Sequence, residues 1–380
     1  MLANVVSVTA NSFRSDFGIA QNTVKAGISA GLAKSTLAAW KQWEIFALEL
    51  ALDPLLETLQ DKIPVLQVFA HRVRTGALAT KGNPIRARSA EDYLRFVAQT
   101  FLSVGAADPR VNSAGSIDFR LQRMLSAWKK EDPPPHRVKP VPVQVLRRIL
   151  FIASQSPCPL LKATADMIVL AFFFLLRPGE YTASSSETQP FDFQSVQLFI
   201  GGRRLNLNTA TEPEILQSRF GSLTFDSQKN GVRGEVIGLG ISGDSFLCPV
   251  RALGRRIIHL RSHNAPLTTP LAMVYHQNKW TKVTSASITS NLRDTVRFLG
   301  HDLGFLPSDV SARCLRAAGA NALLLAKIDP DVIRLIGRWR SDEMLRYLHV
   351  QAAPLMADYS RRMVSAGYFT LIPNGSVPMH

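Results

Sequence analysis

The chain has 380 residues, of which 46% are hydrophobic and 19% are charged. That balance excludes a disordered or fibrous protein and predicts a globular one, long enough for two domains. Forty-four Lys and Arg against 29 Asp and Glu leave a net charge of +15, which favours a polyanionic partner such as nucleic acid.

The first third of the chain predicts a bundle of helices. Residues 1–30 carry no clear period and are expected to be loosely ordered, whereas residues 31–130 hold four helical patterns joined by short turns. Ser35 and Ser89 are the expected N-caps of the first and third helices, and Leu37 is expected to face the core. The four patterns start near Ser35, Val65, Ser89 and Phe119.

Residues 131–142 read EDPPPHRVKPVP, with five prolines in twelve positions. Such a segment predicts a semi-rigid, extended linker, so we place the domain boundary there. A second domain is expected over 143–365, followed by a tail over 366–380.

The second domain mixes helical and strand patterns. Short strands are expected at 196–200, 222–225 and 235–237, with turns at Gly221, Asn230-Gly231 and Gly234. Helices are expected at 143–154, 163–176, 249–261, 285–299, 315–326, 330–336, 341–350 and 354–365. The predicted fold class is therefore mainly α with a small antiparallel β-sheet, an α+β protein.

The cysteines and the apolar runs exclude several other classes of protein. Cys158, Cys248 and Cys314 are odd in number and widely spaced, which favours a reducing compartment over a disulfide framework or a zinc site. No signal peptide is expected, and the most apolar run, 167–176, is too short to cross a bilayer. We expect a buried helix there and no membrane partner.

Three short segments carry groups suited to phosphate chemistry. An apolar helix ends at Arg177, and Glu180 follows three residues later. Arg313 and Arg316 open a helix rich in small residues, and paired arginines at a helix N-terminus bind anions well. Tyr347 follows a Gly-Arg-Trp-Arg-Ser-Asp segment on a predicted helix. Taken singly, each segment also fits an ordinary role: an ion pair that ends a helix, a solvated basic face, or a packing tyrosine.

In their order and spacing these segments resemble the tyrosine recombinase family, also called the phage integrase family. Arg177 and Glu180 match its first arginine box, and Arg316 matches the arginine of its His-x-x-Arg box. Trp339 matches its Gly-x-His or Gly-x-Trp box, 23 residues after Arg316, and Tyr347 follows by eight more. The resemblance implies a tyrosine-recombinase catalytic domain preceded by a helical core-binding domain.

The resemblance covers residues 140–365 closely and 30–130 by general pattern. Lys229 stands in the predicted hairpin where the family lysine belongs. The phrases Leu-Leu-Arg-Pro-Gly-Glu-Tyr and Gly-Arg-Trp-Arg-Ser-Asp are most similar to integrase-like proteins of eukaryotic mobile elements of the Crypton or DIRS kind. A nuclear location is then expected, or a cytoplasmic one at the nucleoid if the source is not eukaryotic.

The activity that the resemblance implies is the cutting and rejoining of DNA strands through a 3′-phosphotyrosyl intermediate on Tyr347. Arg177 and Arg316 would neutralise the charge that builds on the phosphate oxygens. Lys229 would give a proton to the departing 5′-oxygen. No carboxylate cluster suggests a magnesium site, so no metal or other cofactor is expected.

The remaining site residues would assist that reaction. Glu180 would orient Arg177, and Trp339 would pack against the phosphate or hydrogen-bond to it through its indole N–H. Arg313 would add positive charge, but it stands where the family has a histidine, and arginine is a poor proton acceptor near neutral pH. The step from Trp339 to Tyr347 is also one residue shorter than the commonest family spacing. Two alternatives therefore stay open: a catalytically inactive DNA-binding derivative of such an enzyme, and a type IB topoisomerase-like enzyme.

Double-stranded DNA is the expected partner, held through its phosphates by basic residues on both domains. The candidates are Lys34, Lys41, Arg72, Arg74, Arg86, Arg88, Arg137 and Lys139. Each could instead be a solubility residue. In the family the last helix, here 354–365, often docks on a neighbouring subunit, which implies self-assembly on DNA as a dimer or tetramer. It could equally cap the core of its own domain.

Overall fold

The computed structural model describes most of the chain. The described residues are 12–13, 15–20, 22–24, 27–79, 82–134, 138–182, 190–225 and 234–339. Arg137, Lys229 and Tyr347 lie outside these ranges, and so do the expected helices at 341–350 and 354–365 and the tail. The chain divides into two compact units, Met1–Pro135 and His136–His380.

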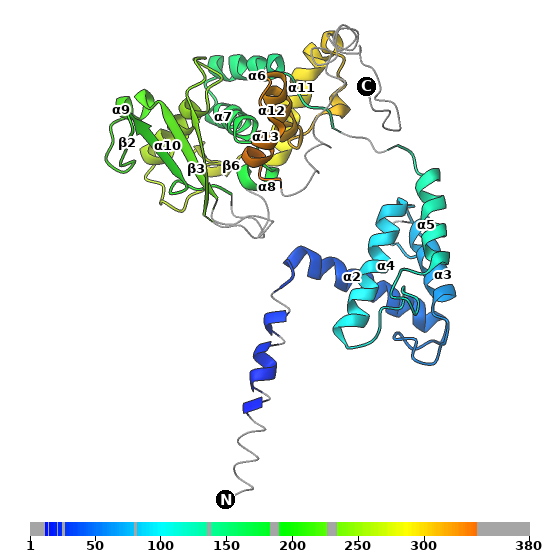
Figure 1. Cartoon of the computed structure of the whole chain (residues 1–380). Helices are drawn as coiled ribbons and strands as arrows, with labels where there is room; N and C mark the ends of the chain where they lie inside the picture. The colour runs from blue at the N-terminus through cyan, green and yellow to red at the C-terminus, as the bar shows by residue number, and fades with distance from the viewer. Residues whose placement is uncertain are drawn as a thin grey trace, which may run out of the picture. The chain divides into compact units, whose positions relative to one another are not determined.

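The core of the first unit is shared by four described helices (Figure 1). They are α2 (Ala30–Glu49), α3 (Ile63–Thr75), α4 (Ala87–Ser103) and α5 (Phe119–Glu131). Trp43 packs edge-on against Phe69 with ring centroids 5.0 Å apart, and Phe46 and Phe101 lie beside them. All four rings are fully buried, so aromatic packing holds α2, α3 and α4 together, and α5 adds Leu121 and Leu125 to the same core.

Helix α2 starts earlier than predicted and leaves one expected core residue in solvent. Ser29 is its N-cap, and Ser35 lies inside the helix, where its hydroxyl donates to the Gly31 carbonyl. Leu37 is 56% exposed. Six residues at about 100° each place Leu37 about 120° round the helix from Trp43, which is fully buried. The prediction that Leu37 faces the core is therefore wrong, because the buried face of α2 is narrower than the apolar pattern indicated.

The start of α4 also differs from the prediction, because its cap comes from elsewhere in the chain. The Ala87 N–H donates to the carboxylate of Asp132 at 2.7 Å, and Ser89 lies inside the helix. Asp132 belongs to the segment expected to be a linker. A carboxylate from 45 residues away thus satisfies an N-terminal N–H that the local sequence assigned to Ser89.

The second unit is built around α7 (Pro159–Phe173). Its residues from Ala163 to Phe172 are all buried, which confirms a buried helix in the apolar run. Helix α7 contacts α6 (Val143–Gln155), α10 (Pro249–Ser262), α11 (Ser285–Leu303) and α12 (Cys314–Leu325). In Figure 1 the strands of the larger sheet lie on the left of this unit and α11, α12 and α13 (Pro330–Gly337) on the right, with α7 between them. No described helix combines the length and apolar character that a membrane span requires.

A four-stranded antiparallel sheet has the strand order β2-β1-β3-β4. Its strands are β1 (Val196–Ile200), β2 (Arg203–Arg204), β3 (Phe220–Phe225) and β4 (Glu235–Gly240). Gly221, expected in a turn, lies inside β3. A Cβ there would come within 2.9 Å of the Leu253 side chain, so a larger residue would require that side chain on α10 to shift. The fold class predicted from the sequence, mainly helical with a small antiparallel sheet, is confirmed.

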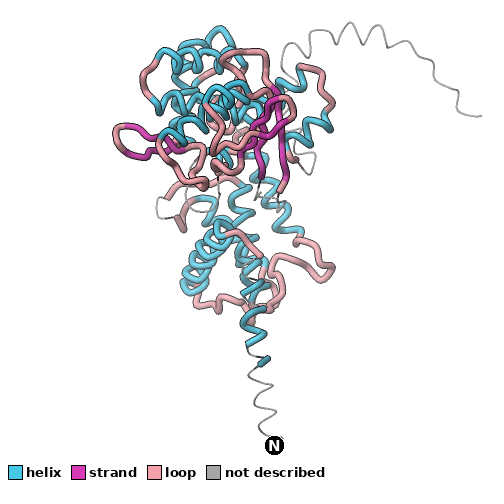
Figure 2. The backbone as a smooth tube through the Cα atoms, turned by 90° about the vertical axis from the view of Figure 1, so that its left-hand side faces the viewer, coloured by secondary structure: helices cyan, strands magenta, loops and turns pink. Residues whose placement is uncertain are grey.

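A second hairpin was not predicted. It pairs β5 (Met273–His276) with β6 (Lys279–Lys282), and Figure 2 shows it as a group of strands separate from the larger sheet. Its turn residues Gln277 and Asn278 both have positive φ, 51° and 59°. Two-residue turns of this kind usually contain glycine, so Gln-Asn carried no clear turn signal. The short helix α9 (Glu212–Gln217) was missed as well.

Candidate active site

The candidate site begins where α7 ends and the backbone reverses. Leu175 has a φ of 50°, a left-handed conformation that is unusual for a residue with a branched side chain. Its carbonyl oxygen accepts hydrogen bonds from Nη1 of Arg316 and from Nη2 of Arg338, both at 3.1 Å. One main-chain oxygen thus binds guanidinium groups from two segments more than 140 residues further along the chain. We call Arg177, Glu180, Arg316, Arg338 and Trp339 the arginine site.

Glu180 connects two of the arginines. It lies on the short helix α8 (Pro178–Tyr181), which begins directly after Arg177. Its Oε1 accepts from Nη1 of Arg177 at 2.9 Å, and its Oε2 accepts from the Arg177 main-chain N–H at 2.7 Å. The same carboxylate accepts from Nη2 of Arg338 at 3.1 Å. Glu180 therefore holds both ends of Arg177 and ties it to Arg338.

Arg316 donates hydrogen bonds to main-chain carbonyls, and an indole ring packs on its guanidinium group. It is 4% exposed, and it donates to the carbonyls of Leu175 and Gly337. Its guanidinium carbon lies 4.2 Å from the centroid of the Trp339 ring. Gly337 makes this packing possible, because a Cβ there would lie 1.6 Å from an atom of the indole. The predicted Gly-x-Trp box is thus a packing device that places a flat ring on Arg316.

Arg338 is a member of the site that the sequence analysis missed. It caps the C-terminus of α13 with a φ of 57°, and it is 5% exposed. Its guanidinium carbon lies 3.7 Å from the centroid of the Phe225 ring, at the end of β3. Burial lowers the pKa of Arg338, and the charge of Glu180 opposes that shift. Trp339 has an arginine on each side in the sequence, and no local pattern shows which of them turns inward.

Arg313 is placed apart from these contacts. It is the N-cap residue of α12, where its main-chain N–H donates to the Ser311 hydroxyl at 3.3 Å. Its side chain is exposed, and none of the described residues forms an ion pair with it. The geometry therefore joins Arg177, Glu180, Arg316 and Trp339 of the predicted set, and it leaves Arg313 in solvent.

The charges of the arginine site do not cancel. Arg177 and Arg338 bind the carboxylate of Glu180, and Arg316 shares the Leu175 carbonyl with Arg338. The site thus holds three guanidinium groups and one carboxylate, with the charge of Glu235 acting on Arg338 as well, and Arg338 and Arg316 are almost wholly removed from water. The Arg177 side chain is 29% exposed, so one cation of the group remains open to a ligand. An excess of fixed positive charge with an accessible guanidinium is suited to binding an anion such as a phosphate diester. In the described ranges no group of three or more His, Cys, Asp or Glu side chains is placed to hold a metal ion.

The predicted DNA contacts fall into two groups. Lys34, Lys41, Arg86 and Arg88 are exposed on α2 and at the start of α4. Lys139 is partly engaged within its own unit, because its ammonium lies 2.9 Å from a carboxylate oxygen of Asp309. Arg72 and Arg74 are engaged too: they form ion pairs with Glu49 at 2.9 Å and Asp132 at 2.8 Å. Arg88 of the exposed group also lies 3.9 Å from carboxylate oxygens of Glu91 and Asp92. Lys34, Lys41 and Arg86 are therefore the most available to a polyanion, whereas Arg72 and Arg74 help to hold their unit together.

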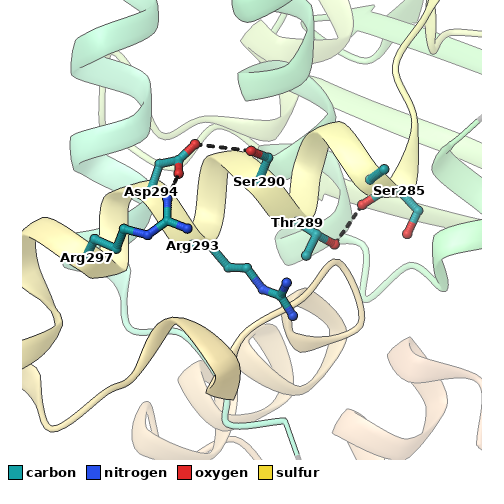
Figure 3. Close-up of a pocket in the computed structure, with 7 residues that line it drawn as sticks. Ser285, Thr289, Ser290, Arg293, Asp294 and Arg297 are labelled. Carbon is teal, nitrogen blue, oxygen red and sulfur yellow. Dashed lines mark hydrogen bonds and ion pairs between the residues drawn. The ribbon is translucent and has the colours of Figure 1, made fainter.

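A surface hollow of about 400 Å³ lies along α11 and is lined by serine, threonine, arginine and aspartate side chains and one alanine. Figure 3 shows Arg293 directed away from the ion pair of Asp294 and Arg297. Nε of Arg293 donates to the Val310 carbonyl at 3.3 Å, which steadies the side chain. The hydroxyls of Thr289 and Ser290 donate to the Ser285 carbonyl and to Asp294, and Arg297 pairs with Asp294, so Arg293 is the donor of the hollow best suited to a phosphate.

The sequence matches no protein-family model and no curated protein. The structure is similar to that of the Tn1549 transposon integrase in complex with transposon right end DNA, at 13% identity, covering 80% of this chain and 86% of that chain with a TM-score of 0.45. A lambda integrase dimer bound to a COC′ core site has 12% identity, coverage of 89% and 96%, and a TM-score of 0.46. XerA recombinase has 14% identity, coverage of 93% and 98%, and a TM-score of 0.38. These solved structures are of integrases and a recombinase, and a function for this chain has to come from its own side chains.

Proposed function

We propose that the chain is a tyrosine recombinase, an enzyme that cuts and rejoins double-stranded DNA without a metal and with Tyr347 as the nucleophile. The observation that carries the proposal is the shared carbonyl of Leu175. It brings together Arg316 and the segment that ends in Trp339, beside Arg177 and its partner Glu180. The sequence order of these groups is the one that resembles the family.

The cutting step needs a nucleophile in line with the departing 5′-oxygen. It also needs cations beside the non-bridging oxygens of the phosphate, to neutralise the negative charge that builds there. Arg177 is the open guanidinium of the site, and it would contact the phosphate first. Arg316 would bind behind it, after exchanging a main-chain carbonyl for a phosphate oxygen. The attack of the Tyr347 oxygen on phosphorus forms a phosphotyrosine, releases the 5′-oxygen, and keeps an ester for the rejoining step.

The two groups outside the described residues are within reach of this site along the chain. Tyr347 follows Trp339 by eight residues, a length that spans at most about 28 Å. Lys229 follows Phe225 by four residues, at most about 14 Å, and the Phe225 ring lies against Arg338. Lys229 is thus the candidate donor of the proton that the 5′-oxygen takes up.

The DNA would be held mainly through its phosphates. Exposed Lys34, Lys41 and Arg88 of the first unit, together with Arg293 and Arg297 on α11, supply the cations. Assembly of two or four copies on one DNA, and an origin in a mobile element of the Crypton or DIRS kind, are further parts of this proposal.

The decisive test is the formation of a covalent adduct. The protein would be incubated with nicked suicide duplexes that carry sites enriched from a random duplex pool by binding. We expect a complex that survives denaturation, and its loss in Tyr347→Phe with DNA binding unchanged. An adduct that persists in Tyr347→Phe would show that another residue is the nucleophile, and no adduct in the wild type would remove the enzyme proposal.

A second candidate function is that of an inactive DNA-binding derivative. Two observations favour it: Arg313 stands in the histidine position and lies in solvent, and Arg316 is turned toward main-chain carbonyls. Binding of the enriched duplex without any adduct is the result that this candidate predicts. A type IB topoisomerase-like enzyme would instead relax supercoiled plasmid that lacks the enriched site.

A further inference from the structure

Arg338 occupies a backbone position at which glycine is the usual residue. Its φ of 57° places it in the left-handed region at the C-terminus of α13. A side chain in that conformation costs about 1 kcal/mol relative to glycine. The cost is accepted here for an arginine whose side chain is 1% exposed, so the contacts of the side chain have to offset both strain and desolvation.

Those contacts join four separate elements. The guanidinium of Arg338 donates to the Leu175 carbonyl after α7 and to the Glu180 carboxylate on α8, both at 3.1 Å. Its flat face lies on the ring of Phe225 at the end of β3. The backbone of Arg338 itself closes α13, with its N–H donating to the Leu335 carbonyl at 2.9 Å. Nη2 makes both of the side-chain hydrogen bonds, Nη1 lies 3.4 Å from Oε1 of Glu180, and the flat guanidinium also lies on the Phe225 ring. A lysine ammonium has neither the second nitrogen nor the flat face.

The contact with Glu180 is the one that bears on chemistry. Glu180 binds the guanidinium and the main-chain N–H of Arg177, the most open cation of the arginine site. A carboxylate bound on one side only could rotate toward solvent with its partner. With Arg338 bound on the other side, Glu180 has one orientation, and Arg177 is directed accordingly.

We propose that Arg338 is a positioning residue of the cutting reaction: it fixes Glu180, and through Glu180 it aims the guanidinium of Arg177 at the scissile phosphate. This inference rests on the proposed function. It also gives the segment 337–339 a double role, since Trp339 covers Arg316 while Arg338 orders Arg177. The same three residues therefore set both arginines of the proposed phosphate site, and the segment ends eight residues before Tyr347.

The test is a double-mutant cycle between Arg338 and Glu180, read out as the rate of adduct formation at saturating duplex and as duplex affinity. Arg338→Lys keeps the charge but loses the second contact with the Glu180 carboxylate, from Nη1, and the flat face on Phe225 that sets the orientation of the group. We expect its rate to fall about 100-fold, the loss typical of a displaced catalytic group, with affinity changed less than about threefold. The rate of adduct formation by Glu180→Gln should fall by a similar factor. The double variant should form the adduct no more slowly than the slower of the two single variants.

A matched control separates positioning from stability. Arg256 is 2% exposed and also donates to two main-chain carbonyls, those of Leu271 and Met273, but it lies outside the arginine site. Arg256→Lys should lower the melting temperature as much as Arg338→Lys and leave the rate per folded molecule unchanged. If Arg338→Lys cuts at the wild-type rate, or if the losses of Arg338→Lys and Glu180→Gln multiply, the positioning role is wrong while the proposed function stands. If the wild type forms no adduct, both are wrong.

Discussion

Two corners of the second unit bury an arginine against main-chain carbonyls, and they differ in what surrounds it. At Arg256 the guanidinium has two carbonyl acceptors to itself, and neighbouring Arg255 pairs with buried Asp166 at 2.5 Å. At Arg338 the acceptors are shared: Leu175 also binds Arg316, and Glu180 also binds Arg177. A buried arginine on a carbonyl is therefore no sign of function by itself. What distinguishes the arginine site is several cations competing for few acceptors, which leaves charge available for an anion.

Burial changes the pKa values of charged groups at both corners. Burial lowers the pKa of Arg256 to about 10, and burial also raises the pKa of Asp166 despite the nearby arginines. This corner is a structural ion cluster whose members are costly to bury and are satisfied by one another. In the arginine site burial also lowers the pKa of Arg338, but Arg177 stays partly exposed and accessible to an anion.

The largest expected effect is the loss of DNA cleavage when arginines of the arginine site are removed. Arg177→Ala and Arg316→Ala should each lower the rate of adduct formation by about 1,000-fold, because they remove charge that acts on the transition state. Duplex affinity should fall far less, as measured by titration at fixed salt. Equal losses of rate and affinity would show that these arginines only position the DNA. Arg256→Lys is the comparison variant.

A smaller effect is expected from filling the space of Gly337. In Gly337→Ala the new Cβ would overlap the Trp339 ring, so the ring has to leave Arg316 or the C-terminus of α13 has to shift. We expect a loss of about 1–3 kcal/mol in the free energy of unfolding and about a tenfold slower adduct formation. Denaturant titration and cleavage kinetics measure the two.

The control for this prediction removes the ring. In a Trp339→Ala background the added methyl group of Gly337→Ala meets no indole, and its stability cost should largely disappear. An undiminished cost in that background would mean that the glycine is needed for the helix end itself and not for the ring.

The smallest expected effect is a pH dependence at the structural corner. Burial, helped by the charge of Arg256, lowers the pKa of His259 from 6.5 to about 4, and its Nε2 accepts from the Tyr275 main-chain N–H at 3.0 Å. The unfolded chain therefore binds a proton below pH 6.5 that the folded chain takes up only near pH 4. Stability present above pH 6.5 should be lost as the pH falls through this window. His259→Gln keeps an acceptor without the titration, so its melting temperature should fall less than that of the wild type between pH 6.5 and 4, whereas parallel curves would contradict the assignment.

Much of the fold could be read along the chain, for reasons that are local. The longer helices of both units appear in the sequence as periodic apolar positions, and β1 occupies the predicted residues 196–200. The β5–β6 turn and the cap of α4 could not be read in this way. The first uses Gln277 and Asn278 in place of glycine, and the second takes its acceptor from Asp132.

For the site, the sequence alone determined which residue types stand in which order: Arg177 with Glu180, Arg316, Trp339 and Tyr347. The tertiary structure decided which of them meet. It brought Arg316 under Trp339, left Arg313 in solvent, and turned Arg338 inward. The physical reason is that the acceptors are main-chain and carboxylate oxygens from distant segments. The direction of a side chain at a left-handed helix end depends on where those oxygens lie, and no periodicity in the sequence records that.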